Sequence, residues 1–386
     1  MLKNLFPIFD INKDLIYLDN ASTTQKPKIL FESLNEGYLN YSFPVGRSFY
    51  KNAEDSYEIF VKSKETVSQK IFLNAEIKNI FFGSSATVVL NTIINGLKKF
   101  IKKNDSIAVM VESHNSMIAP ILKLKEEIGF KLFFFDESNL NEIFDLKNLK
   151  FLFLTGTSNT TGNEIDLKKI RNLLPENVFF IVDFAQTLSY KNVNLKDLKI
   201  DFAVGSSHKM YGPYGISPFY ISERLLEKIE PTVVGGGNIS EINFDKFFLK
   251  NDYEKITFGS VSVPEIFAFS KVCNFLYDYI YFNERLNSFY KESMEKFNIF
   301  FKDKKNIKII SNEKSKKIFS FYIENLSSHD LAEKLALEKI FVRAGNLCSH
   351  LFFEKNKIPP IVRISLGCYN KDYEIEKTIK IIDSFL

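Results

Sequence analysis

Apolar positions follow two different spacings along the first two thirds of the chain. Short continuous apolar runs, typical of buried strands, alternate with longer stretches in which apolar residues recur every three or four positions, as on one face of a helix. Because strands that alternate with helices form parallel sheets covered on both faces, this pattern predicts an α/β fold. The predicted strands cover residues 16–19, 79–82, 106–111, 131–135, 150–154, 178–182, 201–204 and 216–221, and the predicted helices cover residues 28–41, 53–72, 88–101 and 116–128.

The pattern changes after residue 264. A long helical stretch, continuous or interrupted, is predicted over residues 265–301, and a smaller strand–helix–strand–helix unit follows over residues 307–386. A chain of 386 residues is long enough for two domains. We therefore expect a large domain over residues 15–270 and a small domain over residues 271–386 together with residues 1–14.

Polar clusters follow several of the predicted strands directly. In open parallel sheets the ligand lies beyond the carboxyl ends of the strands, where such clusters meet although they are far apart in sequence. The sequence therefore predicts one binding site at this edge of the sheet. The clusters are residues 83–87, His114, Asn159, Asp183 and residues 206–209.

Lys209 carries the most specific chemistry among these clusters. A lysine that loses solvation on burial has a lowered pKa, and its neutral amine can form a Schiff base with an aldehyde. Alone, Lys209 is better explained as a solvated surface lysine; between Ser-Ser-His and a Gly-Pro turn, a chemical role is favoured. Pyridoxal 5'-phosphate also needs a carboxylate for its ring nitrogen, for which Asp183 is the candidate.

Each of the other candidates has a simpler structural interpretation. Asp183 is equally well explained as a helix cap, and residues 84–87 as the start of a helix whose amides could bind phosphate. His114 and Asn159 are, taken singly, better explained as loop and turn residues. The combination of these residues favours a pyridoxal phosphate site.

Composition excludes several other classes of protein. The chain has 51 basic and 47 acidic residues, a net charge of only +4, which argues against a nucleic-acid-binding protein. Its three cysteines form no closely spaced pair, which argues against a disulfide framework and for a reducing compartment. The sequence has no secretory signal and no apolar run of membrane-spanning length. We expect a cytoplasmic protein with no membrane partner and no metal site.

The candidate residues lie within a series of short motifs. They are YLDNASTTQKP at 17–27, VGR at 45–47, SSAT at 84–87, His114, NTTG at 159–162, DFAQ at 183–186, SSHKMYGP at 206–213, GGG at 235–237, RAGNLC at 343–348 and VRIS at 362–365. Taken in this order, they cover nearly the whole chain. The sequence resembles the class V aminotransferases of pyridoxal phosphate fold type I, and in particular their cysteine desulfurase and selenocysteine lyase branch.

This resemblance implies a mainly parallel seven-stranded sheet in the large domain, a smaller α/β C-terminal domain, and a bound pyridoxal 5'-phosphate. It places Lys209 on the cofactor's aldehyde and Asp183 on its ring nitrogen, with Lys209 also moving a substrate proton. It further implies that His114 stacks on the face of the ring and that Gln186 and Asn159 contact the ring oxygen. The residues that it implies for the phosphate are Ala86, Thr87, Ser206 and His208.

The resemblance also implies the substrate contacts and the reaction. Arg363 is expected to clamp the substrate carboxylate, with Ala21 and Arg343 also in contact with the substrate. Cys348 is expected to take the sulfur of L-cysteine, which leaves alanine and an enzyme persulfide. Ser260 stands where the family has a threonine that reaches the phosphate of the neighbouring subunit, which implies a homodimer. A sulfur-acceptor protein and a role in iron–sulfur cluster assembly are further implications.

Departures from the family pattern leave the substrate open. Gly46 stands where the family has histidine before Arg47, and 346–347 (Asn-Leu) replaces His-His before the nucleophile. Cys348 could instead be a small buried apolar residue, as Cys273 and Cys368 are expected to be. The alternatives are an aminotransferase, lyase or epimerase that acts on another amino acid, and a partner-binding scaffold that has lost catalysis.

Overall fold

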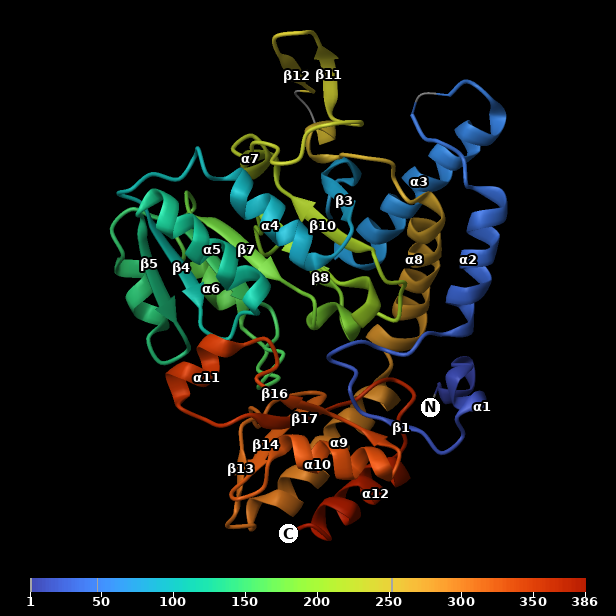
Figure 1. The fold of residues 1–386 in the computed structure, drawn as a ribbon, viewed down its shortest axis with the longest axis vertical. Helices are drawn as coiled ribbons and strands as arrows, with labels where there is room; N and C mark the ends of the chain where they lie inside the picture. Colours follow the sequence, from blue (N-terminus) through green and yellow to red (C-terminus); the bar gives the residue numbers. More distant parts are fainter. Residues whose placement is uncertain (1, 47, 251–252) are drawn as a thin grey trace.

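A seven-stranded sheet forms the centre of the larger part of the molecule in the computed structural model, which describes residues 2–46, 48–250 and 253–386 (Figure 1). Arg47, named above as part of a motif, lies outside the described residues. The strand order is β3-β10-β9-β7-β6-β4-β5, and only β10 is antiparallel to its neighbours. The predicted mainly parallel α/β sheet is therefore confirmed. The strands are β3 (Ile80–Gly83), β4 (Ser106–Met110), β5 (Lys131–Phe135), β6 (Leu149–Thr155), β7 (Phe179–Asp183), β9 (Phe202–Val204) and β10 (Ser217–Ile221).

Both faces of this sheet are buried. In β6, Phe151 and Phe153 pack into one hydrophobic cluster while Leu152 and Leu154 pack into another, because successive side chains point to opposite faces. A strand buried on both faces has a continuous apolar sequence, which is why the pattern identified these strands. The cluster with Phe151 includes residues of α4 (Ala86–Gly96), α5 (Asn115–Ile128) and α7 (Glu223–Leu226). The cluster with Leu152 includes residues of α3 (Lys51–Lys70), α6 (Leu167–Leu173) and α8 (Val263–Leu276). Helix α2 (Lys28–Asn40) packs on α8.

A four-stranded antiparallel sheet forms the centre of the smaller part, below the first in Figure 1. Its order is β13 (Ile307–Ile309), β14 (Ile318–Ile323), β17 (Ile361–Ser365) and β16 (Arg343–Gly345), and α9 (Glu284–Lys302), α10 (Ser328–Leu337) and α12 (Asp372–Asp383) pack around it. The N-terminal segment contacts this part: α1 (Ile8–Ile11) lies beside it, and β1 (Ile16–Tyr17) pairs with β15 (Ile340–Phe341). The predicted domain boundaries stay a prediction.

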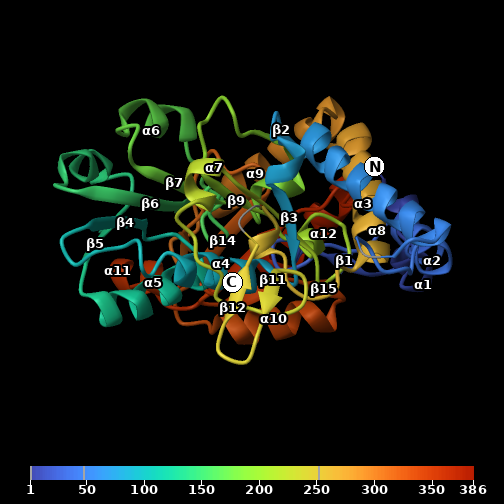
Figure 2. The same cartoon turned by 90° about the horizontal axis from the view of Figure 1, so that it is seen from above.

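Several elements differ from the sequence-based expectations. The predicted helix to residue 101 ends at Gly96, where an added Cβ would lie 2.7 Å from the Glu230 carbonyl oxygen. The long C-terminal helical stretch is interrupted by a π-helical segment, Tyr277–Tyr281, before Asn283 caps α9. The hairpin of β11 (Ile239–Ile242) and β12 (Phe247–Leu249) projects from the top of the molecule in Figure 1 and lies in front of the body in Figure 2, which is the view from above. It was not predicted, and neither was the pair of β2 (Phe72–Leu73) and β8 (Val193–Asn194), because strands this short have too few residues to show a period.

The remaining elements are short. They are the 3-10 turns Lys3–Leu5, Ile77–Asn79, Leu140–Asp145, Thr187–Ser189, Ser207–Lys209 and Tyr253–Ile256, and the helix α11 (His350–Asn356). No helix within the described ranges is long and apolar enough to span a bilayer.

Candidate active site

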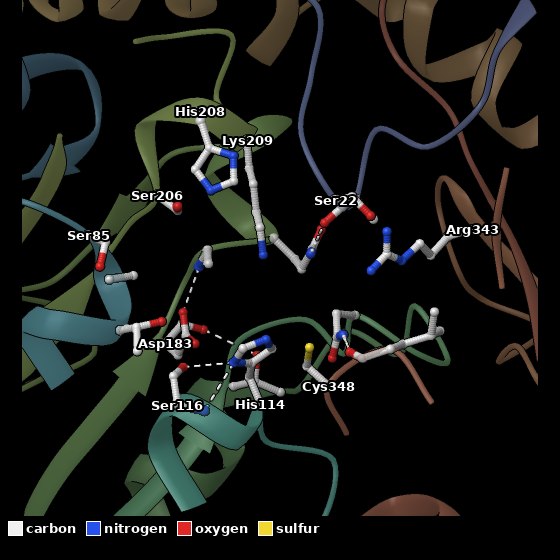
Figure 3. Close-up of a pocket in the computed structure, with 18 of the residues that line it drawn as sticks. Ser22, Ser85, His114, Ser116, Asp183, Ser206, His208, Lys209, Arg343 and Cys348 are labelled. Atoms are coloured by element: carbon white, nitrogen blue, oxygen red, sulfur yellow. Dashed lines mark hydrogen bonds between the residues drawn. The ribbon is translucent and has the colours of Figure 1, made fainter. Parts of the chain in front are cut away.

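A cavity of about 300 Å³ lies at the carboxyl ends of the parallel strands, and the C-terminal part supplies its other wall (Figure 3). Every predicted site residue except Ser260 lines this cavity. The strand-end rule therefore predicted the location of the site, while the individual roles stay predictions. The residues that the sequence reasoning missed include Ser22, Ser116, Thr155, Ala185 and Leu347. Most of them adjoin a predicted residue in sequence, which is the only signal that could have found them.

Ser260 lies elsewhere in its own chain. It lines a second cavity of about 200 Å³ together with Ser84 and Val88. Its predicted contact with the phosphate of a neighbouring subunit stays a prediction.

Lys209 closes the 3-10 turn that follows β9, and its side chain points into the cavity (Figure 3). The loop of residues 23–26 fixes the backbone before it, since the His208 carbonyl oxygen accepts hydrogen bonds from Thr24 N (3.0 Å), Thr24 Oγ1 (3.1 Å), Thr23 Oγ1 (3.1 Å) and Lys26 Nζ (2.8 Å). Within the described residues Lys209 Nζ makes no hydrogen bond or ion pair. Burial lowers the pKa of Lys209, and the carboxylate of Asp183 offsets part of this effect. The side chain thus presents an amine that deprotonates more readily than an ordinary lysine.

Asp183 is the last residue of β7 and is almost completely buried. One carboxylate oxygen accepts a hydrogen bond from Ala185 N at 2.8 Å, and this is the only hydrogen bond of the carboxyl group among the described residues. Burial raises its pKa, while the bond from Ala185 and the charge of Lys209 oppose the shift. A buried carboxyl with an unused oxygen at a cavity wall can hold a protonated ring nitrogen of a ligand.

Hydrogen-bond donors for an anion gather at the start of α4. Ser85 is the N-cap of this helix, its Oγ accepting from Val88 N at 3.2 Å, so the first amides beyond it, at Ala86 and Thr87, lack partners within the helix. His208 faces the same side of the cavity in Figure 3, and its buried Nδ1 has no partner among the described residues. Burial and the charges of Lys209 and Lys26 lower the pKa of His208 to about 4, so the imidazole is neutral near pH 7.

His114 is the N-cap of α5, and its Nδ1 accepts from Ser116 N at 3.1 Å. The same nitrogen lies 2.7 Å from Ser116 Oγ. Burial, together with the charges of Lys209 and Arg363, lowers the pKa of His114 to about 4. The ring is therefore uncharged near pH 7 and lies at the cavity wall, where it can stack on an aromatic ligand.

The lowered pKa of His114 makes the stability of the protein depend on pH. The unfolded chain binds a proton at this residue below about pH 6.5, whereas the folded protein does so only near pH 4, so acidification between these values favours unfolding. Replacing His114 by asparagine keeps an N-cap acceptor. We expect the stability lost between about pH 7 and pH 4.5 in urea unfolding to be smaller in His114→Asn by about 2 to 3 kcal/mol. Equal losses in the two proteins would show that His114 titrates normally.

Two arginines on neighbouring strands reach the cavity, and they differ in how many of their nitrogens are hydrogen-bonded. Arg363 is buried: its Nη1 donates to Asn159 O (3.0 Å), and its Nη2 donates to Asp19 Oδ1 (3.0 Å) and Ser22 Oγ (2.8 Å). Arg343, its cross-strand partner, is exposed, points into the cavity and makes no hydrogen bond or ion pair with the described residues. Arg343 therefore has a fully unpaired guanidinium, while Arg363 keeps a buried Nε without a partner among the described residues. The predicted contacts of both arginines with a substrate stay predictions.

Cys348 is the only exposed cysteine of the three; Cys273 and Cys368 are buried, as expected. It follows β16, and Figure 3 shows its sulfur beside His114 at the cavity wall. Leu347 and Cys348 both have left-handed backbone angles, with φ of 51° and 57°. That conformation costs about 1 to 2 kcal/mol for each non-glycine residue, so surrounding contacts must hold the turn.

The side-chain amides of Asn159 and Gln186 form hydrogen bonds within the protein. Asn159 Nδ2 donates to Leu347 O (2.7 Å), and Asn159 Oδ1 accepts from Ser349 Oγ (2.9 Å). Gln186 Nε2 donates to Ala21 O (2.8 Å). Their predicted contacts with a ring oxygen stay predictions, and in Asn159 the same amide holds the segment that carries Cys348.

Comparison with known proteins identifies the family of this site. The Aminotransferase class-V family model matches residues 16–378. The chain belongs to the class-V aminotransferase family. Among curated relatives, a protein of Borreliella burgdorferi named "Probable cysteine desulfurase" is 33% identical over 98% of this chain and 94% of its own length. A protein of Ureaplasma parvum with the same name is 28% identical over 99% and 96%.

Solved structures agree with this assignment. The apo structure of a cysteine desulfurase from Thermococcus onnurineus superposes with a TM-score of 0.89 at 25% identity and covers 100% of this chain and 97% of its own. A cysteine desulfurase from Escherichia coli gives a TM-score of 0.88 at 23% identity, covering 99% of this chain and 97% of its own, and shows the same fold. The predicted family and fold type I are confirmed.

The residues of the cavity fit pyridoxal 5'-phosphate, the cofactor of this class-V enzyme. The amine of Lys209 has no other partner among the described residues, the carboxyl of Asp183 has an unused oxygen, and the unpaired Nδ1 of His208 lies near a helix N-terminus. These are the three groups that an aldehyde, a pyridine nitrogen and a phosphate require. The structure therefore has a partner for each polar end of the cofactor.

Proposed function

We propose that this protein is a pyridoxal phosphate-dependent cysteine desulfurase that converts L-cysteine to L-alanine and keeps the sulfur as a persulfide on Cys348. The observation that carries the proposal is the presence of an exposed thiol in the same cavity as the amine of Lys209 and the carboxyl of Asp183. The names of the curated relatives and their near-complete overlap with this chain support it.

Lys209 would hold the aldehyde of the cofactor and Asp183 its ring nitrogen, with His114 against the ring. The phosphate of the cofactor would lie at the start of α4. The residues that would bind it are Ala86, Thr87, Ser206 and His208. When bound, the cofactor withdraws electrons from the α-carbon of the substrate. All other steps fall to the side chains of this protein.

Arg363 and Arg343 bind the substrate carboxylate and so orient the amino acid. The neutral amine of Lys209 takes the proton from the α-carbon and returns a proton to carbon. The thiolate of Cys348 forms an S–S bond with the substrate sulfur while the C–S bond of the substrate breaks. The electron pair of that bond stays with the β-carbon, which takes up a proton, so L-cysteine and the enzyme thiol become alanine and the enzyme persulfide.

Assay of purified holoenzyme with L-cysteine and a thiol reductant tests this function. We expect equal amounts of alanine and sulfide, and we expect Arg343→Ala to raise KM about tenfold or more, because a charged hydrogen bond to the substrate is lost. Arg285→Ala is the matched control, because it removes an exposed arginine of α9 that does not line the cavity. An enzyme that is inert towards L-cysteine but acts on another amino acid would instead be an aminotransferase, lyase or epimerase.

The assembly and the cellular role extend this proposal. A homodimer in which Ser260 reaches the phosphate site of the other subunit would account for the position of Ser260 away from the cavity of its own chain. A cytoplasmic acceptor protein would then take the persulfide sulfur for iron–sulfur cluster assembly. Both features follow from the family resemblance.

A further inference from the structure

The segment that carries the thiol is held by contacts from outside its own part of the molecule. We call residues 345–349 the thiol loop; it joins β16 to α11. Leu347 and Cys348 hold left-handed backbone angles in it. Non-glycine residues keep such angles only where the surrounding structure fixes them.

The first fixing contact comes from α5 of the large part. Asn115 N donates to the Cys348 carbonyl oxygen at 2.8 Å. The Asn115 side chain then binds the residue at the start of α11 in two ways: Nδ2 donates to His350 Nδ1 at 2.7 Å, and Oδ1 accepts from His350 N at 3.3 Å. One asparagine thus holds both the carbonyl of the nucleophile and the helix that follows it.

The second contact is buried and comes from the turn after β6. Asn159 binds Leu347 O and Ser349 Oγ, one on each side of Cys348. The far end of α11 is also attached to the large part, through the ion pair of Lys355 with Asp136, and Leu351 packs against the core formed with α4 and α5. In Figure 1, α11 lies below α5, away from the helices of the small part.

We propose that Asn115 and His350 form a latch that positions the Cys348 thiol for attack on the substrate sulfur. The inference rests on the proposed function, because it assigns the latch to the sulfur-transfer step. Of the two contacts, that of Asn159 is buried, whereas His350 is exposed and Asn115 is half-buried. The latch is therefore the contact that water or a docking partner can open. Asn115 and His350 are positioning residues, since they act through the thiol loop and do not line the cavity.

Attack of the Cys348 thiol on the substrate sulfur requires that the thiol loop hold the thiol in place. A nucleophile displaced by about 1 Å from its attack geometry loses up to about 100-fold in rate. Opening the latch leaves the substrate-binding arginines and the groups around the cofactor in place. The expected kinetic signature is therefore a fall in kcat for alanine formation of about tenfold with KM for L-cysteine unchanged.

The experiment compares holoenzyme variants by amide hydrogen exchange of the peptide spanning the thiol loop and by steady-state kinetics. We expect Asn115→Ala, which removes both side-chain bonds, and His350→Ala, which removes the bond to Nδ1, each to speed exchange of this peptide several-fold and to lower kcat. We expect the double variant to match Asn115→Ala, because the His350 side chain acts through Asn115. Asn115→Asp keeps an acceptor for His350 N and is expected to retain most of the activity. Asn356→Ala is the matched control: it removes an asparagine hydrogen bond at the other end of α11 and should change neither quantity.

Three outcomes would overturn the latch: unchanged exchange in Asn115→Ala, an effect of Asn115→Ala that His350→Ala does not share, or additive losses in the double variant. Hydrogen exchange is measured without L-cysteine and does not depend on turnover. If the wild-type protein releases no alanine, the proposed function fails, while faster exchange in the two single variants still establishes the contact between α5 and the thiol loop.

Discussion

Replacing Lys209 by alanine is expected to abolish alanine formation from L-cysteine, with a loss of at least about 1000-fold. The amine has no other partner among the described residues and is the only lysine that lines the cavity. Its burial lowers its pKa, which suits the two roles that we propose for it, attachment point of the aldehyde and base at the α-carbon. We expect the purified variant to lack the visible absorption band of a lysine-bound cofactor.

The Lys209→Arg variant distinguishes the chemistry of the amine from the effect of its positive charge. Arginine keeps a cation near Asp183 but stays protonated and cannot take up a proton from carbon. We expect Lys209→Arg to be as inactive as Lys209→Ala. Activity in either variant would remove Lys209 from the mechanism.

Replacing Cys348 by alanine is expected to lower alanine formation at least about 100-fold while the bound cofactor and its absorption band remain. The thiol is the sulfur acceptor in this account, but it is not one of the groups that bind the aldehyde, the ring nitrogen or the phosphate. Steady-state kinetics and the absorption spectrum, measured on the same preparation, test the two parts of this prediction.

Cys273→Ala is the matched control for this variant. Cys273 is buried in α8, outside the cavity, and burial raises its pKa well above that of a free thiol. Its loss removes one sulfur atom and should leave kcat unchanged per folded protein. Full activity of Cys348→Ala would show that another group accepts the sulfur, or that the reaction does not pass through an enzyme thiol.

The location of the site could be predicted from the sequence because a general rule of parallel sheets governs it. Asp183 ends β7, and Lys209 lies just beyond the end of the neighbouring β9, so the sheet places a carboxyl and an amine side by side. The apolar runs located the central strands for a similar reason, since strands covered on both faces contain few polar residues.

The contacts between the two parts of the molecule could not be predicted in this way. The bond from Asn115 to His350 joins residues 235 positions apart and depends on how α11 packs against α5. Arg363 carries the motif expected of a carboxylate clamp, but only the structure shows that its Nη2 already donates to Asp19 and that the neighbouring Arg343 has no hydrogen bond with the described residues. No local spacing contains this information, because the packing of distant elements decides which of two similar side chains keeps unpaired hydrogen-bond donors.

The most direct test of the account is a mass spectrum of the Cys348 peptide after holoenzyme is mixed with a limited amount of L-cysteine in the absence of reductant. The account predicts that Cys348 gains one sulfur atom and that one alanine is released for each sulfur gained. Alanine without any gain of sulfur at Cys348, or sulfur found instead on Cys273 or Cys368, would contradict it.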